Sequence, residues 1–307
     1  MQTTNRNRNY LADFVLLMAS LVWGSTFFLV KNALDFIAPF YFMTLRFGLA
    51  LFVITVIVAP QIRRLSSLEL MGGVLTGLSL FMGFTFQTWG LVYTTAGKSA
   101  FITGLNVILV PFILLTLGHQ RIRPKGWWAA GLATLGLLLL TNPTTADNLN
   151  RGDGLTILCA IAFAVQIILL GIYAPKANTL RYFWVQMATI SLLSAGATSM
   201  TDSWQLALSP ELIRALLITG FAGTTLAFLG MTWAQRYAPP TRVALILASE
   251  PVFGAVFAVM VAGEYLALIG WLGGALIVGA IIWAETGNRK NGSRAAEDPA
   301  RSHSVAP

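Results

Sequence analysis

The chain has 307 residues, of which 56% are hydrophobic and only 10% are charged. A soluble globular domain cannot bury so much apolar surface, so this composition excludes that class and predicts an integral membrane protein. The formal net charge of +8 does not indicate nucleic-acid binding, because the Lys and Arg residues lie scattered between apolar runs. The single cysteine, Cys159, excludes an intrachain disulfide, and two distant histidines, His119 and His303, exclude a histidine metal site. We expect no cofactor.

The N-terminal segment, residues 1–11, leads into an apolar stretch that is too long for a signal-peptide core. Crossing a bilayer takes about 20 apolar residues in a helix, since unpaired backbone groups cannot be left in lipid. Successive candidate spans lie at 12–30, 37–59, 70–91, 99–117, 127–142, 154–174, 182–200, 212–233, 243–262 and 267–284. The sequence therefore predicts an all-α integral membrane protein with ten transmembrane helices. The polar tail, residues 286–307, is expected to be disordered.

The distribution of Lys and Arg between alternate loops predicts the orientation, because positive residues are retained on the cytoplasmic side. With the N-terminus inside, only Lys31, Lys98, Arg151 and Arg214 fall outside, and Arg46 falls within a span. The remaining residues all fall inside: Arg6, Arg8, Arg63, Arg64, Arg121, Arg123, Lys125, Lys176, Arg181, Arg236, Arg242, Arg289, Lys290, Arg294 and Arg301. We expect a multi-pass protein of the bacterial inner (plasma) membrane, with both termini in the cytoplasm.

The chain also contains an internal repeat. An offset of 144 aligns Thr88-Trp89 with Thr232-Trp233, Tyr93 with Tyr237, Lys98 with Arg242, and Gly126-Trp127 with Gly270-Trp271. The first helices align at an offset near 140, where Asp13 meets Asp153 and Trp23 meets Phe163. The repeat predicts two five-helix halves, residues 12–143 and 152–285.

Because each half has an odd number of helices, equivalent helices must cross the bilayer in opposite directions. Such inverted-topology repeats place a substrate site near the bilayer midplane and expose it to each side in turn. This architecture favours a transporter over an enzyme.

Five short segments carry a family resemblance: residues 21–26 (LVWGST), 45–47 (LRF), 99–111 (SAFITGLNVILVP), 248–252 (ASEPV) and 262–264 (AGE). Together they resemble the drug/metabolite transporter superfamily, specifically its ten-helix EamA-type proteins. Members of that family export different substrates, amino acids among them, so the resemblance implies a mechanism more closely than a substrate.

The two halves differ at several aligned positions. At an offset of 145, Asn106 stands opposite Pro251, and the proline of the first half comes later, at Pro111. We therefore expect the helices over 99–117 and 243–262 to bend at different depths. Met187 stands roughly where the second copy of Arg46 would be.

The resemblance implies a cavity lined by the first, third, fourth, sixth, eighth and ninth spans. Uncharged polar side chains inside those spans are candidates for substrate binding: Thr26, Gln87, Thr103, Asn106, Gln166 and Thr225, with Ser25, Thr224 and Ser249 beside them. The alternative is that the hydroxyls bond to their own helix and the amides join neighbouring helices.

Aromatic side chains are the second group of candidates. Trp23, Phe84 and Phe228, with Phe163, could stack against an apolar part of a substrate. Trp23 is favoured because it lies mid-span beside Gly24, where a missing side chain lets a backbone or a ligand approach. The alternative for aromatic residues in general is packing or anchoring at the membrane interface.

Two ionisable residues are predicted inside spans, where an unpaired charge is costly. Arg46 is interpreted as a structural charge that reaches the outer surface or binds backbone carbonyls. Glu250 directly precedes Pro251, whose ring opens the helical hydrogen-bond ladder, and is the candidate for proton coupling. The alternative is that Glu250 binds those freed carbonyls or pairs with Arg46. Charges near the span ends are expected to be solvated: Asp13, Lys98 and Glu264.

The leading hypothesis is a secondary exporter of small neutral or zwitterionic metabolites such as amino acids, since no ATP-binding Gly-x-x-x-x-Gly-Lys-Ser/Thr motif occurs. Within transport, a nucleotide-sugar or phosphate-ester carrier and a lipid flippase are the alternatives. A membrane enzyme acting on lipid-linked substrates would need clustered His, Asp, Glu or Cys, which the sequence lacks. The expected partners are a small-molecule substrate and membrane lipid. Small residues in the fifth and tenth spans would also allow a homodimer: Gly131, Gly136, Gly274 and Gly279.

Overall fold

The computed structural model describes residues 2–118, 124–141, 150–201, 209–262 and 265–297, and every element in these ranges is helical. The first half contains α1 (Gln2–Ala33), α2 (Pro39–Val58), η1 (Ala59–Arg64), α3 (Ser67–Tyr93), α4 (Ala96–Gly104), α5 (Asn106–Thr116) and α6 (Pro124–Thr141). The second half contains α7 (Arg151–Tyr173), η3 (Ala174–Lys176), α8 (Thr179–Thr201), α9 (Pro210–Leu217), η4 (Ile218–Leu226), α10 (Ala227–Ala234), α11 (Pro240–Leu247), α12 (Glu250–Ala262) and α13 (Leu268–Glu297). The predicted all-α class is confirmed.

Each predicted span coincides with one helix or with consecutive helical segments. The spans over 99–117, 212–233 and 243–262 are each divided into shorter segments. Seven of the described helices are long and apolar enough to cross a membrane, judged by length and composition, and Leu268–Ala284 is a shorter apolar helix. The count of ten crossings therefore stays a prediction.

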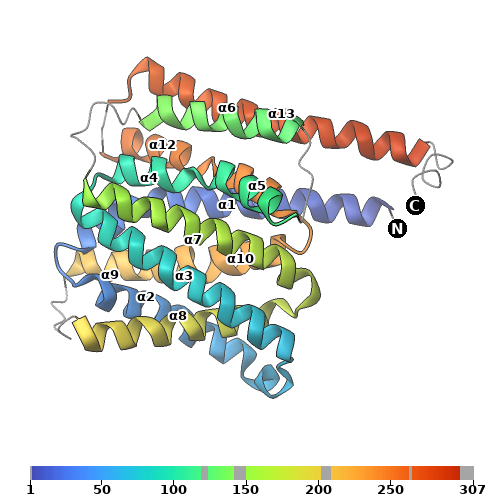
Figure 1. The fold of residues 1–307 in the computed structure, drawn as a ribbon. Coiled ribbons are helices and arrows are strands. Elements are labelled where there is room, and N and C mark those ends of the chain that lie inside the picture. Colours follow the sequence, from blue (N-terminus) through green and yellow to red (C-terminus); the bar gives the residue numbers. More distant parts are fainter. Residues whose placement is uncertain (1, 119–123, 142–149, 202–208, 263–264, 298–307) are drawn as a thin grey trace.

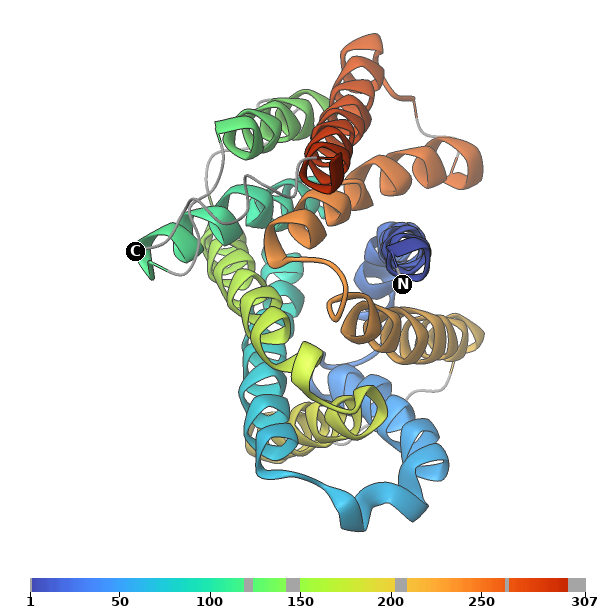
Figure 2. The ribbon, with the colours of Figure 1, turned by 90° about the vertical axis from the view of Figure 1, so that its right-hand side faces the viewer.

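The helices pack in pairs that map onto one another when the two halves are exchanged. α1 packs along α10, and its counterpart α7 packs along α3, the counterpart of α10. α2 packs against its own counterpart α8, and α6 against its own counterpart α13. Figure 2 shows these two pairs at opposite ends of the bundle. The packing is what two related halves would produce.

The course of the chain in Figure 1 also relates the halves. α1 begins and α13 ends on the same side of the bundle, which is the right-hand side of the figure. α7, the counterpart of α1, begins on the opposite side. α1 and α7 thus run in opposite directions in this view.

The fourth span of each half breaks at an equivalent point. α4 ends before Leu105 (φ −61°, ψ −9°), and α11 ends before Ala248 (φ −61°, ψ −12°). The expectation that the two helices bend at different depths is wrong, because Pro111 lies inside α5 without ending it. Instead, the amide of Leu105 bonds the carbonyl of Ile102 in a tighter turn.

Glycine allows close packing where α6 crosses α13. A Cβ atom on Gly136 would lie 2.7 Å from the carbonyl oxygen of Gly273, so the two backbones touch. A Cβ atom added at Gly131 or Gly279 would have no atom within 4 Å apart from the nearby backbone of its own helix. Gly136 therefore joins two halves of the same chain, and the homodimer stays a prediction.

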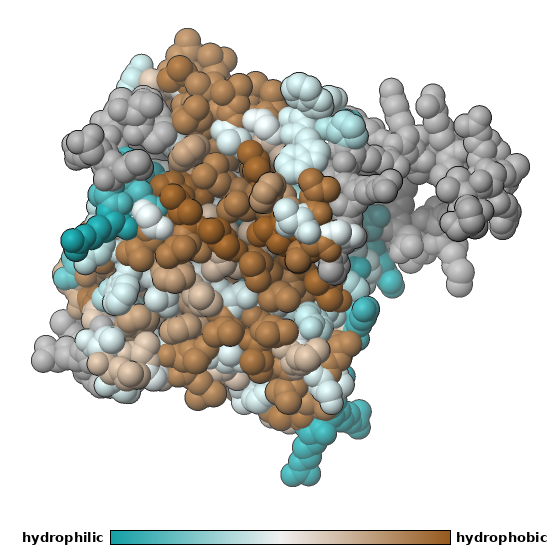
Figure 3. Space-filling view, in the orientation of Figure 1, coloured by the Kyte–Doolittle hydropathy of each residue, from teal (hydrophilic) through white to brown (hydrophobic). Residues whose placement is uncertain are grey.

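The outer surface is strongly apolar. Figure 3 shows hydrophobic side chains across the middle of one face, with hydrophilic residues at its left and right edges. Large exposed residues such as Phe52, Leu192 and Met260 belong to this surface. A continuous apolar surface of this kind is suited to contact with lipid.

Some expectations concern the ends of the chain and its loops. α13 remains helical as far as Glu297, through residues that were assigned to a disordered tail and that include good helix formers such as Ala, Arg and Lys. Residues 298–307 lie outside the described ranges, and so do His119 and Glu264. Disorder of the tail stays a prediction for those last residues.

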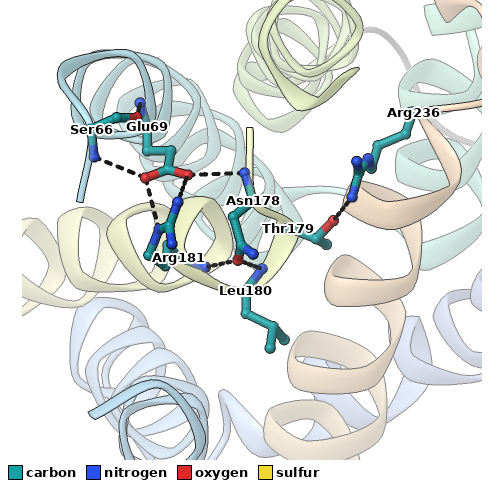
Figure 4. Close-up of polar contacts among 7 residues, drawn as sticks. All are labelled: Ser66, Glu69, Asn178, Thr179, Leu180, Arg181 and Arg236. Carbon is teal, nitrogen blue, oxygen red and sulfur yellow. Dashed lines mark hydrogen bonds and ion pairs between the residues drawn. The ribbon is translucent and has the colours of Figure 1, made fainter. Parts of the chain in front are cut away.

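An ion pair joins α3 to α8 (Figure 4). Ser66 caps α3, and its own backbone N–H donates to the Glu69 carboxylate. The same carboxylate accepts hydrogen bonds from Nε and Nη2 of Arg181, at 2.9 and 2.7 Å, and from the backbone N–H of Asn178 at 2.9 Å. Every lone pair of a nearly buried carboxylate is used, so this cluster fixes the two helices relative to each other.

We expect Arg181→Gln to lower the free energy of unfolding by roughly 1–3 kcal/mol, because the Glu69 carboxylate would keep only backbone donors. The measurement is the thermal unfolding midpoint of the purified protein in detergent. Arg236→Gln is the matched control, since Arg236 makes one exposed hydrogen bond, to Thr179 at 3.2 Å. Equal shifts for the two variants would contradict the role of the cluster.

Candidate functional site

A cavity with about 620 Å³ of space, its open mouth included, lies between helices of both halves. Of the site residues proposed from the sequence, all but Thr225 line this cavity. They are Trp23, Thr26, Arg46, Phe84, Gln87, Thr103, Asn106, Gln166, Phe228 and Glu250. The remaining wall is formed by Val30, Leu91, Phe163, Ile167, Met231 and Leu247. The structure thus gathers residues that are far apart in the chain around one space.

Thr225 is the exception, because it lies outside the cavity wall. It belongs to η4, a π-helix, in which its hydroxyl donates to the carbonyl of Gly220, five residues earlier. A π-helical segment changes which side chains share a face. The neighbouring Thr224 also lies outside the cavity wall, but its hydroxyl accepts a hydrogen bond from Nε of the cavity residue Arg46.

Aromatic rings form one wall of the cavity. The Trp23 and Phe228 ring centroids lie 4.7 Å apart, and the Phe84 ring meets Phe228 at 5.8 Å and Phe163 at 5.2 Å. The indole Nε1 of Trp23 donates to the carbonyl of Gly223 at 2.7 Å, which fixes the ring. The wall therefore offers a rigid apolar surface to a ligand.

Gly24 lies beside Trp23, and its neighbour is a backbone. A Cβ atom there would lie 2.7 Å from the amide nitrogen of Gly254, and it would also collide with the carbonyl oxygen of Glu250. Gly24 thus lets α1 approach α12, which carries the cavity residue Glu250.

The polar candidates divide into two groups. Several hydroxyls donate to carbonyls of their own helix, as the alternative interpretation expected: Ser25, Thr26, Thr225 and Ser249. Asn106 and Gln166 are different, because they are 92% and 99% buried and each has a side-chain atom, Oδ1 and Nε2 respectively, without a hydrogen-bond partner in the structure. Buried polar groups are rarely left unpaired, so these two amides are available to a bound molecule.

Arg46 lies in the cavity wall rather than reaching the outer surface. It is 4% exposed, and its Nε donates to the hydroxyl of Thr224 at 2.8 Å. Its guanidinium carbon lies 4.7 Å from the Phe84 ring centroid and 5.4 Å from that of Phe47. Among the described residues, no ion pair joins Arg46 to Glu250, so the pairing considered from the sequence does not occur.

Each of two further ion pairs includes a residue in the first turn of a helix. Asp153 completes the capping box of α7, whose N-cap is Asn150; it accepts a hydrogen bond from Thr94 at 2.6 Å and pairs with Lys98 at 3.4 Å. Asp13 pairs with Arg242. The expectation that Asp13 and Lys98 are solvated is wrong, because each faces an opposite charge from a different helix.

Known proteins provide an independent comparison. A family model described as "EamA-like transporter family" matches residues 10–142 and 150–285. The chain belongs to this family. The resemblance found in the sequence is confirmed, and this EamA-like transporter is a multi-pass membrane protein that acts on a small molecule.

Several relatives of this EamA-like transporter are curated proteins. An uncharacterized transporter of Archaeoglobus fulgidus is 34% identical over 272 residues, which cover 88% of this chain and 84% of the relative. The uncharacterized transporter YrdR of Bacillus subtilis is 24% identical over 173 residues, which cover 53% and 51%. A protein of known crystal structure has the same fold, with a TM-score of 0.77 and 18% identity over 91% of this chain and 98% of that chain.

Proposed function

We propose that this transporter is a secondary exporter of small neutral or zwitterionic metabolites, such as amino acids, that works by alternating access. The observation that carries the proposal is the cavity between the halves, which combines an aromatic wall with two unpaired amides.

We further propose ten crossings in inverted topology. The opposite directions of α1 and α7 support this topology, as does the packing that maps one half onto the other. The start of α1 and the end of α13 on one side of the bundle support an even number of crossings. Together with the Lys and Arg bias, these features support an inner-membrane protein with cytoplasmic termini.

The two ion pairs at helix ends fit alternating access. Asp13 and Arg242 are the repeat counterparts of Asp153 and Lys98, and α1 and α7 begin on opposite sides of the bundle. Each pair therefore joins equivalent helices at one of the two ends. In the proposed cycle, one pair opens while the other stays closed, and Glu250 takes up and releases the coupling proton.

We expect purified protein in proteoliposomes to take up a zwitterion when amino acids, nucleotide sugars, phosphate esters and lipids are offered in parallel. Trp23→Ala and Asn106→Ala should each reduce this uptake by about tenfold, the equivalent of one lost contact worth about 1.4 kcal/mol. Both variants should still insert into the membrane, as judged by their yield in the membrane fraction. Normal transport of every substrate by both variants would show that the site assignment is wrong.

Reporter fusions at the two ends of the chain test the orientation. A reporter that is active only in the cytoplasm should be active at both ends, because the positive loops are retained inside. A periplasmic reporter that is active at either end would exclude the proposed topology.

Side-specific labelling tests the ion pairs as closures. In a Cys159→Ala background, Gln87→Cys supplies a thiol in the cavity. Asp153→Asn should increase its labelling by a membrane-impermeant maleimide from the side where α7 begins, and Asp13→Asn from the side where α1 begins, because each removes one ion pair. This role would be ruled out if both variants increased labelling from the same side, or if neither variant increased labelling.

A further inference from the structure

We infer that the cavity binds its substrate between two opposite charges: Arg46 binds a carboxylate, and the deprotonated form of Glu250 binds an ammonium group of the same molecule. This inference rests on the proposed function and narrows its substrate to a zwitterion with an apolar side group. It also gives Arg46 a binding role in place of the structural one expected from the sequence.

The guanidinium of Arg46 is held in place but incompletely used. Its one hydrogen bond among the described residues is the Nε donation to Thr224, which leaves the Nη groups without an acceptor. The faces of Phe84 and Phe47 support the guanidinium plane and offer it no acceptor oxygen. Gly223 lies beside the guanidinium, since an added Cβ there would be in van der Waals contact with Nη2, at 3.7 Å. A planar fork of free N–H donors in an apolar wall is suited to a carboxylate.

Glu250 presents the opposite charge from another helix. It is the first residue of α12 and lines the same cavity, but its carboxyl group makes no hydrogen bond or ion pair with any described residue. It lies where α12 packs against α1 and α4, which carry Trp23 and Thr103. These helices also carry Lys31 and Lys98, but Lys31 donates to the carbonyls of Leu91 and Thr94, and Lys98 pairs with Asp153. Neither forms an ion pair with Glu250 among the described residues, so a bound ligand is the remaining source of a cation.

The two charges share one cavity without pairing with each other. A charge in a water-poor site needs an opposite charge, and the protein holds these two apart. An anion alone would leave Glu250 unpaired, and a cation alone would leave Arg46 unpaired. A zwitterion satisfies both at once, which provides selection against singly charged molecules.

The two unpaired amides, Asn106 and Gln166, can add a hydrogen bond to each charged group of the ligand. Asn106 offers an acceptor oxygen, which suits an ammonium group, and Gln166 offers a donor nitrogen, which suits a carboxylate. Both are more than nine-tenths buried, and both line the cavity. The aromatic wall of Trp23, Phe84 and Phe228 then receives the apolar side group.

Three ligands with the same side group test the charges separately. L-phenylalanine is the zwitterion, phenylalanine amide is the cation and N-acetylphenylalanine is the anion. We expect wild-type protein in detergent, followed by its tryptophan fluorescence, to bind the zwitterion most tightly. Arg46→Gln should weaken the zwitterion and the anion by about tenfold or more and leave the cation unchanged. Glu250→Gln should weaken the zwitterion and the cation and leave the anion unchanged.

Exposed residues offer matched controls: Arg151→Gln and Glu211→Gln make the same chemical changes at the starts of α7 and α9 and should leave all three affinities unchanged. Equal weakening of all three ligands by each cavity variant, or no weakening, would overturn the inference, as would wild-type protein that binds none of them. Transport of zwitterions without the crossed pattern would reject this inference alone. Failure of proteoliposomes to transport any compound in the panel would reject the proposed function itself.

Discussion

Everything in this structure follows from the absence of water in the bilayer core, where each backbone N–H and C=O group must find its partner inside the protein. Regular helices meet this requirement, and the described chain is helical throughout its apolar regions. The departures from regular helix are therefore informative. The breaks at Leu105 and Ala248 lie beside the cavity residues Asn106 and Glu250. The π-helix η4 contains Thr224, which accepts a hydrogen bond from the cavity residue Arg46. These three interruptions of apolar helical spans therefore lie next to the cavity or to a partner of one of its residues.

The same constraint sorts the charges. Glu69, Asp153 and Asp13 are each paired with a cation from another helix, and each pair includes a residue in the first turn of a helix. Arg46 and Glu250 lie deeper and face the cavity instead. The three ion pairs thus hold helices together, whereas Arg46 and Glu250 are placed to bind a ligand.

Much of this could be predicted from the sequence, because long apolar runs and an internal repeat are strong signals in a membrane protein. The cavity residues followed from the family resemblance together with the rule that a polar group in lipid needs a partner. Thr225 lies outside the cavity wall, because polarity within a span does not reveal which side of the helix a hydroxyl faces, and the sequence does not reveal the π-helix that contains it. The pairing of Asp13 with Arg242 joins opposite ends of the chain, which no local pattern reveals. Apolar cavity residues such as Ile167 and Met231 resemble lipid-facing residues in sequence, so only the structure separates them.

The two halves share their helix packing but differ in the charges that they place in the cavity. The packing of the helices is nearly the same after exchange of the halves, which is what a site exposed to each side in turn requires. The charges of the cavity do not obey that exchange. Asn106 begins α5 where Glu250 begins α12, and buried Met187 stands roughly where a second Arg46 would be. Each half therefore contributes one charge that its counterpart lacks, so the scaffold is symmetric while the cavity has a positive and a negative end. With one charge of each sign on different helices, the cavity can orient a dipolar molecule. The repeated helices thus provide for the proposed movement, and the differences between the halves at the positions of Arg46 and Glu250 provide selectivity for a zwitterion.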